Sequence, residues 1–269
     1  MDKSKEILEI CDAIEKLYNM YLEMLKNNYE KLDLDKKLKY AVIYANVMFG
    51  YGREASILQQ LNWNTSIEPL TRDLLESYAI AKNLILSYSD DIKFNGYLKY
   101  IFCEDMNQDK KIYVKLKNDT TIFDIAKRDT ELESLLTRLQ NMINTYFPEE
   151  SPCIDLNNLE FSILKIIRRI SRQFPSKSKE DIVGNALKEN RAWKNNNIEG
   201  HPYDGSYVIY KSLCHSSHNN FGSVLERNIQ NGFFILNSES LNIKGALSLD
   251  YYCMKDIYDE LSGILKGKQ

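Results

Sequence analysis

Two of the three histidines in the chain, His215 and His218, lie beside Cys214 in the segment YKSLCHSSHNN. Imidazole and thiol groups can act as general bases, nucleophiles or metal ligands. On a helix, where successive residues turn by about 100°, Cys214 and His218 share one apolar face. A histidine on such a face is most often a core residue with hydrogen-bonded ring nitrogens, so a catalytic role needs partners from elsewhere in the chain.

Cysteine and histidine at this spacing raise two further alternatives, a metal site and a nucleophile pair. Cys214 and His218 could hold one metal ion, with His215 as a third ligand. No carboxylate or further histidine stands at ligand spacing, so we expect no metal and no cofactor. The Cys/His nucleophile pair has little support, because both residues lie on one helix face and no oxyanion motif is visible.

Partners for His218 are available in the segment PLTRDLLESYAIAKNLI, which contains Arg72 and Glu76. If that segment packs against the histidine helix, Glu76 can fix the His218 tautomer and Arg72 can reach a phosphate. Tyr210 adds a hydroxyl. In this interpretation His218 takes the proton of a ribose 2′-OH without a metal, and Arg72 stabilises the charge that develops on the phosphate. The alternative is a buried Arg–Glu–His network that only sets helix register.

Two motifs carry a resemblance to a known group of proteins. The first is the segment RDLLE, from Arg72 to Glu76, and the second is Tyr-x3-Cys-x3-His, formed by Tyr210, Cys214 and His218. In this order they resemble a widespread bacterial family of all-helical proteins of unknown function. The matching blocks span roughly residues 41–86 and 191–225.

Such families are similar to the HEPN superfamily of helical RNA-cleaving and nucleotide-binding domains. The resemblance implies a metal-independent endoribonuclease or nucleotide-binding effector in a toxin or phage-defence system. That superfamily carries an arginine a few residues before a histidine on one helix, whereas no arginine here precedes a histidine by four to six residues. The RNase hypothesis therefore takes Arg72 and His218 from different helices.

A cluster of cations suggests a second kind of site. One helical segment carries them on adjoining positions: Lys165, Arg168, Arg169 and Arg172. Clustered cations can neutralise phosphates even in a mildly acidic protein, so these residues are the RNA-binding candidates. A solvated helix face without a ligand is the alternative.

Composition and periodicity predict the elements that hold these residues. Glycine (11) and proline (5) are scarce, which favours long helices. Apolar residues recur at three- and four-residue steps along most of the chain, which predicts an all-α multi-helix bundle of about eight to ten helices. We expect a single domain, residues 1–269, in which the two long helices of residues 3–61 can form a dimerising or packing arm.

Three segments carry more specific expectations. The helix near residues 67–86 is apolar nearly all round, which predicts a central position in the fold. Residues 105–121 are polar and lysine-rich, which suggests a surface excursion with a short strand at residues 112–117. The histidine helix is expected from about residue 205 to about residue 231.

Charge and sorting signals limit the partners. The net charge is −3, the charged N-terminus is no signal peptide, and no apolar run approaches the about 20 residues of a membrane span. Five dispersed cysteines without a CxxC pair indicate a reducing cytosol. We expect a cytoplasmic protein with RNA as the candidate ligand and a homodimer or protein partner as a further option. The rival function is a non-enzymatic helical interaction module.

Overall fold

The computed structural model describes residues 3–61, 67–119, 125–190, 229–230, 233–234 and 243–267. Within these ranges the chain forms nine α-helices, which confirms the predicted all-α bundle. Two antiparallel two-residue strands, β1 (Ile229–Gln230) and β2 (Phe233–Phe234), are the other regular elements apart from short 3-10 turns. The predicted histidine helix lies outside the described residues except at residues 229–230, which are extended instead.

The chain divides into two compact units. Unit 1 comprises residues 1–89 and 178–269, and unit 2 comprises residues 90–177. Each unit has its own buried apolar residues. The expectation that residues 1–269 fold as one domain stays a prediction.

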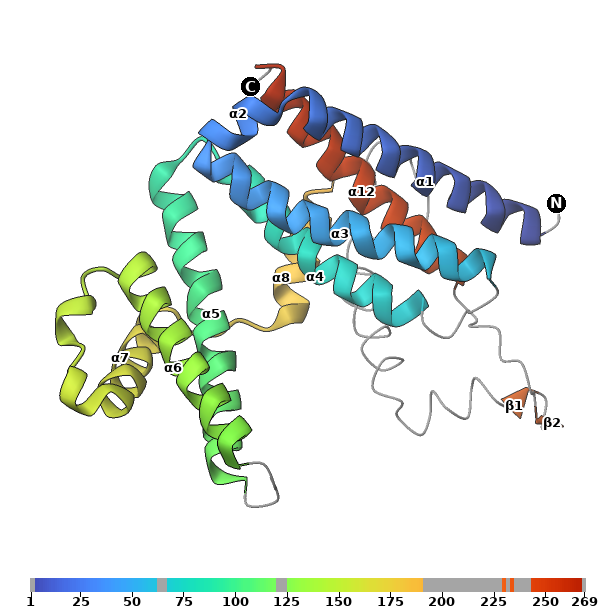
Figure 1. Cartoon of the computed structure of the whole chain (residues 1–269). Helices are drawn as coiled ribbons and strands as arrows, with labels where there is room; N and C mark the ends of the chain where they lie inside the picture. The colour runs from blue at the N-terminus through green and yellow to red at the C-terminus, as the bar shows by residue number, and fades with distance from the viewer. Residues whose placement is uncertain are drawn as a thin grey trace. The chain divides into compact units, whose positions relative to one another are not determined.

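Unit 1 is built around α4 (Ile67–Leu86), as its apolar circumference predicts. This helix packs against three others, α3, α8 and α12, which leaves little of its surface for solvent (Figure 1). A further helix, α1, packs against α3 and α12. The bounds of the remaining helices in unit 1 are α1 (Lys3–Asn27), α2 (Tyr29–Leu34), α3 (Lys36–Gln60), α8 (Lys179–Lys188) and α12 (Ile243–Leu265).

Gly52 marks the point where α3 comes close to α4 and α12. A Cβ atom at this position would collide with Met254 Sδ of α12 and lie 3.2 Å from Leu74 Cδ1 of α4. The missing side chain therefore lets three helices approach one another. Close packing of this kind is sensitive to the addition of even one methyl group.

Unit 2 consists of α5 (Asp91–Asn118), α6 (Ile125–Tyr146) and α7 (Leu159–Gln173). Isoleucines of α7 pack into a core with residues of α5 and α6. Ion pairs at the edges add links between the helices: Arg138 Nε lies 2.9 Å from Asp109 Oδ2, and Lys117 Nζ lies 2.6 Å from Glu160 Oε1. The short 3-10 turns Ser151–Cys153 and Leu156–Asn158 connect α6 to α7.

The predicted surface excursion at residues 105–121 is wrong, because α5 continues through residue 118. The helix is capped by Asp90, whose side chain accepts hydrogen bonds from the backbone N–H groups of Ile92 and Lys93. Met106 and Tyr113, in the stretch expected to be surface loop, are buried. The expected strand at residues 112–117 is therefore the last part of this helix.

No helix within the described ranges is long and apolar enough to cross a membrane. The prediction of a cytoplasmic location is a finer statement and stays a prediction.

Candidate functional site

The predicted site residues fall into three groups. His218 and Tyr210, with Cys214 and His215, lie outside the described residues. Arg72 and Glu76 lie on α4 in unit 1. The four candidate RNA-binding cations lie together on α7 in unit 2.

Arg72 and Glu76 form an ion pair along one face of α4. Arg72 Nη2 lies 3.2 Å from Glu76 Oε1, and Lys179 of α8 binds the other carboxylate oxygen. The side chains of Arg72 and Glu76 are 21% and 22% exposed, so solvent reaches both. Partial burial raises the pKa of the neighbouring Asp73 carboxyl. A cation of this exposure can meet a phosphate, but contact of either residue with His218 stays a prediction.

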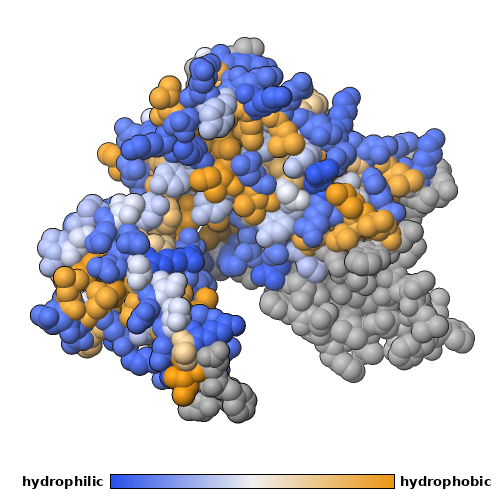
Figure 2. Space-filling model, viewed as in Figure 1, coloured by the Kyte–Doolittle hydropathy of each residue, from blue (hydrophilic) through white to orange (hydrophobic). Residues whose placement is uncertain are grey.

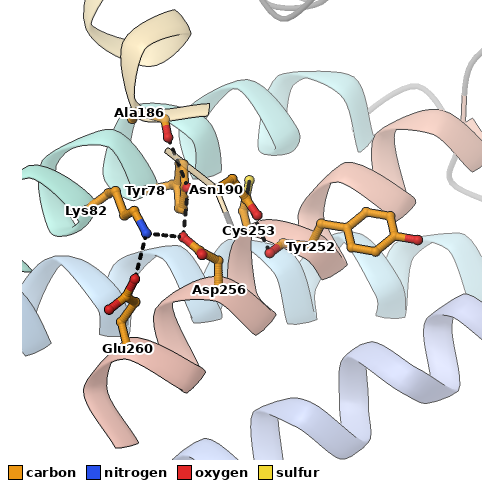
Figure 3. A network of polar contacts seen from close by, with 8 residues as sticks. All are labelled: Tyr78, Lys82, Ala186, Asn190, Tyr252, Cys253, Asp256 and Glu260. Carbon is orange, nitrogen blue, oxygen red and sulfur yellow. Dashed lines mark hydrogen bonds and ion pairs between the residues drawn. The ribbon is translucent and has the colours of Figure 1, made fainter. Parts of the chain in front are cut away.

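A buried ionic network that the sequence did not suggest crosses unit 1 (Figure 3). Lys82 of α4 is 0% exposed, and its Nζ lies 2.8 Å from Asp256 Oδ2 and 3.1 Å from Glu260 Oε1, both on α12. Tyr78, one turn before Lys82, donates a hydrogen bond of 2.9 Å to the same Asp256 oxygen. Asp256 therefore has a cation and a hydroxyl as partners, as a buried carboxylate requires.

The same network continues toward the end of α8. Asn190 Nδ2 lies 3.4 Å from the Tyr252 carbonyl oxygen and 3.9 Å from Cys253 Sγ. Burial raises the pKa of the Cys253 thiol well above its usual value, and that of the Tyr78 hydroxyl as well. A thiol that keeps its proton is a poor nucleophile, so we interpret this network as structural.

Asp250 is a second buried carboxyl on α12. Thr71 Oγ1 of α4 donates a hydrogen bond of 2.9 Å to Asp250 Oδ2, while Oδ1 has no hydrogen-bond partner among the described residues. Burial raises the pKa of Asp250 well above its usual value. The cause is that burial disfavours the charged carboxylate, and the described chain places no cation against it as compensation.

The α7 helix has two chemically opposite faces. Its buried face carries Ser162 and four isoleucines, and 3.6-residue periodicity puts the four candidate cations on the other side. All four cations are exposed: Lys165, Arg168, Arg169 and Arg172. The four residues therefore share a solvent-facing surface, which either alternative from the sequence requires. Their binding of RNA stays a prediction.

Phe161 extends this surface by one turn. It precedes Lys165 by four residues, so it falls on the same side of α7, within an arc of about 100° that also contains the four cations. Its side chain is 62% exposed, although phenylalanine is usually buried. An exposed aromatic ring thus adjoins the cations. We call Phe161, Lys165, Arg168, Arg169 and Arg172 the basic face.

The basic face borders an open pocket of about 560 Å³. Its rim also includes residues of the turn before α7: Cys153, Asp155 and Asn158. Arg169 is paired with Glu150, which fixes its guanidinium beside the turn. Lys165, Arg168 and Arg172 make no ion pair with any carboxylate in the described part of the chain.

Lys110 of α5 lies close enough to Arg168 for the two positive charges to repel each other. Burial lowers the pKa of the Lys110 ammonium, and the charge of Arg168 lowers it further. A bound anion near both groups would offset this repulsion. The four-residue spacing between Phe161 and Lys165 could have placed Phe161 on this surface from the sequence alone. The interaction of Lys110 with Arg168 could be found only in the folded structure.

No group of three or more potential metal-ligating side chains occurs among the described residues. Comparison with known proteins gave no match to a protein-family model, a curated protein or a solved structure. The resemblance to a bacterial helical family and to HEPN domains therefore stays a prediction, and the function has to be inferred from the site itself.

Proposed function

We propose that this protein binds single-stranded RNA through the basic face of α7. The observation that carries the proposal is the row of three exposed cations without carboxylate partners in the described chain, Lys165, Arg168 and Arg172. Exposed cations in most folded proteins are interspersed with acidic residues, so an unpaired row on one helix face favours a polyanion. The repulsion between Lys110 and Arg168 favours an anion at the same place.

The geometry favours a single strand over a duplex. The basic face runs from Phe161 to Arg172, about 16 Å along the helix axis, which is enough for a few phosphates of an extended strand. A duplex keeps its bases stacked inside, whereas a single strand can place a base on the exposed Phe161 ring. Arginine also binds phosphate oxygens in pairs through its planar guanidinium.

Anisotropy titrations with labelled single-stranded RNA at several salt concentrations test the proposal. Each phosphate contact to a single strand contributes about −0.7 to the slope of log affinity against log salt. Arg168→Gln/Arg172→Gln should therefore weaken binding and make the slope less negative by about 1.4. The matched control is Lys111→Gln/Lys115→Gln, which removes two exposed cations from α5 outside the basic face.

Phe161→Ala separates stacking from charge. A base stacked on an aromatic ring contributes about 1–3 kcal/mol, so this variant should lose roughly 5- to 150-fold in affinity for single-stranded RNA. Its salt slope and its affinity for a duplex should stay unchanged. The proposal is wrong if the arginine variant and the lysine control bind alike. If heparin competes for the basic face as well as unlabelled RNA does, the face is an anion-binding site without preference for RNA, and the assignment to RNA is wrong.

RNA cleavage through Arg72, Glu76, Tyr210 and His218 is a separate prediction. The exposure of the Arg72–Glu76 pair leaves it open to a ligand. The RNA titration measures affinity and requires no cleavage, so its outcome tests binding at α7 separately from this prediction.

A further inference from the structure

The outward face of α3 carries a stripe of exposed apolar side chains. Ile43 is 49% exposed, Val47 43% and Ile57 40%, and Leu61, the C-cap residue that follows α3, is 60% exposed. Figure 2 shows apolar side chains reaching the surface of unit 1 over this helix, between polar ones. The buried residues of α3 are a different set, so the core of unit 1 does not use this stripe.

The spacing of the stripe is that of a helix-pairing seam. Together with Gly50 and Glu54, which are also exposed, the four apolar residues follow one another at alternating steps of four and three. This is the heptad spacing by which two helices pack knobs into holes. The seam covers most of the length of α3.

The order of residues along the seam is symmetric about Gly52. Ile43 and Leu61 lie nine residues to either side of it, Val47 and Ile57 five residues, and Gly50 and Glu54 two residues. When two copies of α3 pair antiparallel about a two-fold axis at this level, each apolar residue meets an apolar residue of the other copy. A surface that matches itself in this way is what a symmetric dimer requires.

The centre of the seam distinguishes antiparallel from parallel pairing. Parallel pairing would set Glu54 against Glu54, two like charges at the same level. Antiparallel pairing sets Glu54 opposite Gly50, where a Cβ atom would have no neighbour within 4 Å.

We propose that two copies of this chain associate through antiparallel pairing of α3 about a two-fold axis at the level of Gly52. Four half-exposed side chains form a smaller surface than the about 800 Å² per partner of a standard interface. The dimer should therefore be weak, and its fraction should rise with protein concentration.

Sedimentation velocity over a concentration series tests the association. The full-length chain should shift from monomer to dimer as concentration rises, and Val47→Glu/Ile57→Glu should stay monomeric. Ile92→Glu/Leu156→Glu serves as the matched control, because it alters two apolar residues that are 86% and 76% exposed and lie outside α3. The control should dimerise like the parent chain. At a concentration where the parent chain is monomeric, all three proteins should unfold cooperatively with similar thermal midpoints, which shows that the variants still fold.

Cysteine cross-linking tests the register. Val47→Cys and Ile57→Cys are made separately in a Cys153→Ser background, because Cys153 is an exposed thiol of the chain. Oxidation of the two proteins mixed should give a cross-linked dimer, whereas Val47→Cys alone should not, since its two copies lie about 15 Å apart along the axis. A monomer at all concentrations, a dimer that survives Val47→Glu/Ile57→Glu, or cross-linking of Val47→Cys with itself would each overturn the proposal.

Discussion

Lys82→Met should destabilise unit 1 more than the removal of any solvent-exposed cation. The substitution keeps the length and apolar character of the side chain but deletes the ammonium group that lies 2.8 Å from Asp256 and 3.1 Å from Glu260. Asp256 is 1% exposed, so water cannot replace the lost cation. Tyr78 would remain as a hydrogen-bond donor to this carboxylate.

The expected loss follows from that burial. Removing one partner of a buried ion pair leaves an uncompensated charge and typically costs about 3–5 kcal/mol. The Tyr78 hydrogen bond and the partial exposure of Glu260, 14%, offset some of this, so we expect about 3 kcal/mol. Lys255→Met is the matched control on α12. Its pair with Asp259 is 37% and 52% exposed, which limits the expected loss to less than about 1 kcal/mol.

Urea titration followed by circular dichroism measures these losses. Circular dichroism at 222 nm follows the loss of helix. Lys82→Met/Asp256→Asn should recover part of the stability, because the deleted cation then leaves no buried charge on Asp256. A loss under about 1 kcal/mol for Lys82→Met, equal to that of the exposed control, would refute the buried network.

Packing and burial lead to three further predictions. Asp250→Asn should remove a pH dependence of stability. Because the pKa of Asp250 is raised in the folded state, the parent chain should lose stability as pH rises from about 4 to that folded pKa, by up to about 1.4 kcal/mol per pH unit. Urea titrations of both proteins at pH 4 and 7 measure the difference. Gly52→Ala should lower the stability of unit 1 by about 1–3 kcal/mol, because the added Cβ atom would collide with Met254. Gly96→Ala should stabilise its helix by up to about 1 kcal/mol, because a Cβ atom there would have no neighbour within 4 Å. Thermal unfolding followed by circular dichroism measures both effects. Arg72→Gln should cost less than about 1 kcal/mol in urea, because its ion pair is partly exposed, and a larger loss would favour the buried structural network.

Periodicity predicted the elements whose packing is repetitive. Tyr78, Leu74 and Ile85 lie at helical steps on α4, and the surrounding helices cover them as expected. On α7, the same 3.6-residue repeat puts Ile166 and Arg168 on opposite faces, and the folded helix buries the first and exposes the second. In both helices the buried face follows from the 3.6-residue spacing of apolar residues, and this spacing can be read from the sequence of the helix alone.

Local composition misled where a helix carries many charges. The second half of α5 has lysines at both ends of the run Ile112–Val114, a composition typical of a polar loop with a short strand. Its buried residues are sparse there, and Tyr113 alone of the three is buried. Its cap at Asp90 lies more than twenty residues upstream. The helix nevertheless buries Met106 and Tyr113, and Lys117 and Asp109 pair with residues of α7 and α6.

The ionic network of unit 1 was beyond the reach of sequence reasoning for a different reason. Lys82 and Glu260 are 178 residues apart, and neither segment contains a signal that points to the other. In the sequence, Lys82 is one more polar residue on an apolar helix. Only the packing of α4 against α12 turns it into the buried partner of two carboxylates.

The contrast between these two groups of cations is the physical reason to place ligand binding at α7. Lys82 is enclosed and already neutralised, so an incoming phosphate would have to displace Asp256 from a site closed to solvent. Arg168 and Arg172 lie on an exposed face, make no ion pair with a carboxylate of the described chain, and would exchange only water and counterions for a phosphate. The net charge of −3 gives the chain no overall attraction for a polyanion, so binding would depend on a local cluster of cations such as the basic face. In a mildly acidic protein, a row of cations without ion-pair partners on the described surface would confine phosphate binding to one place, whereas a uniformly basic protein would bind phosphates over much of its surface.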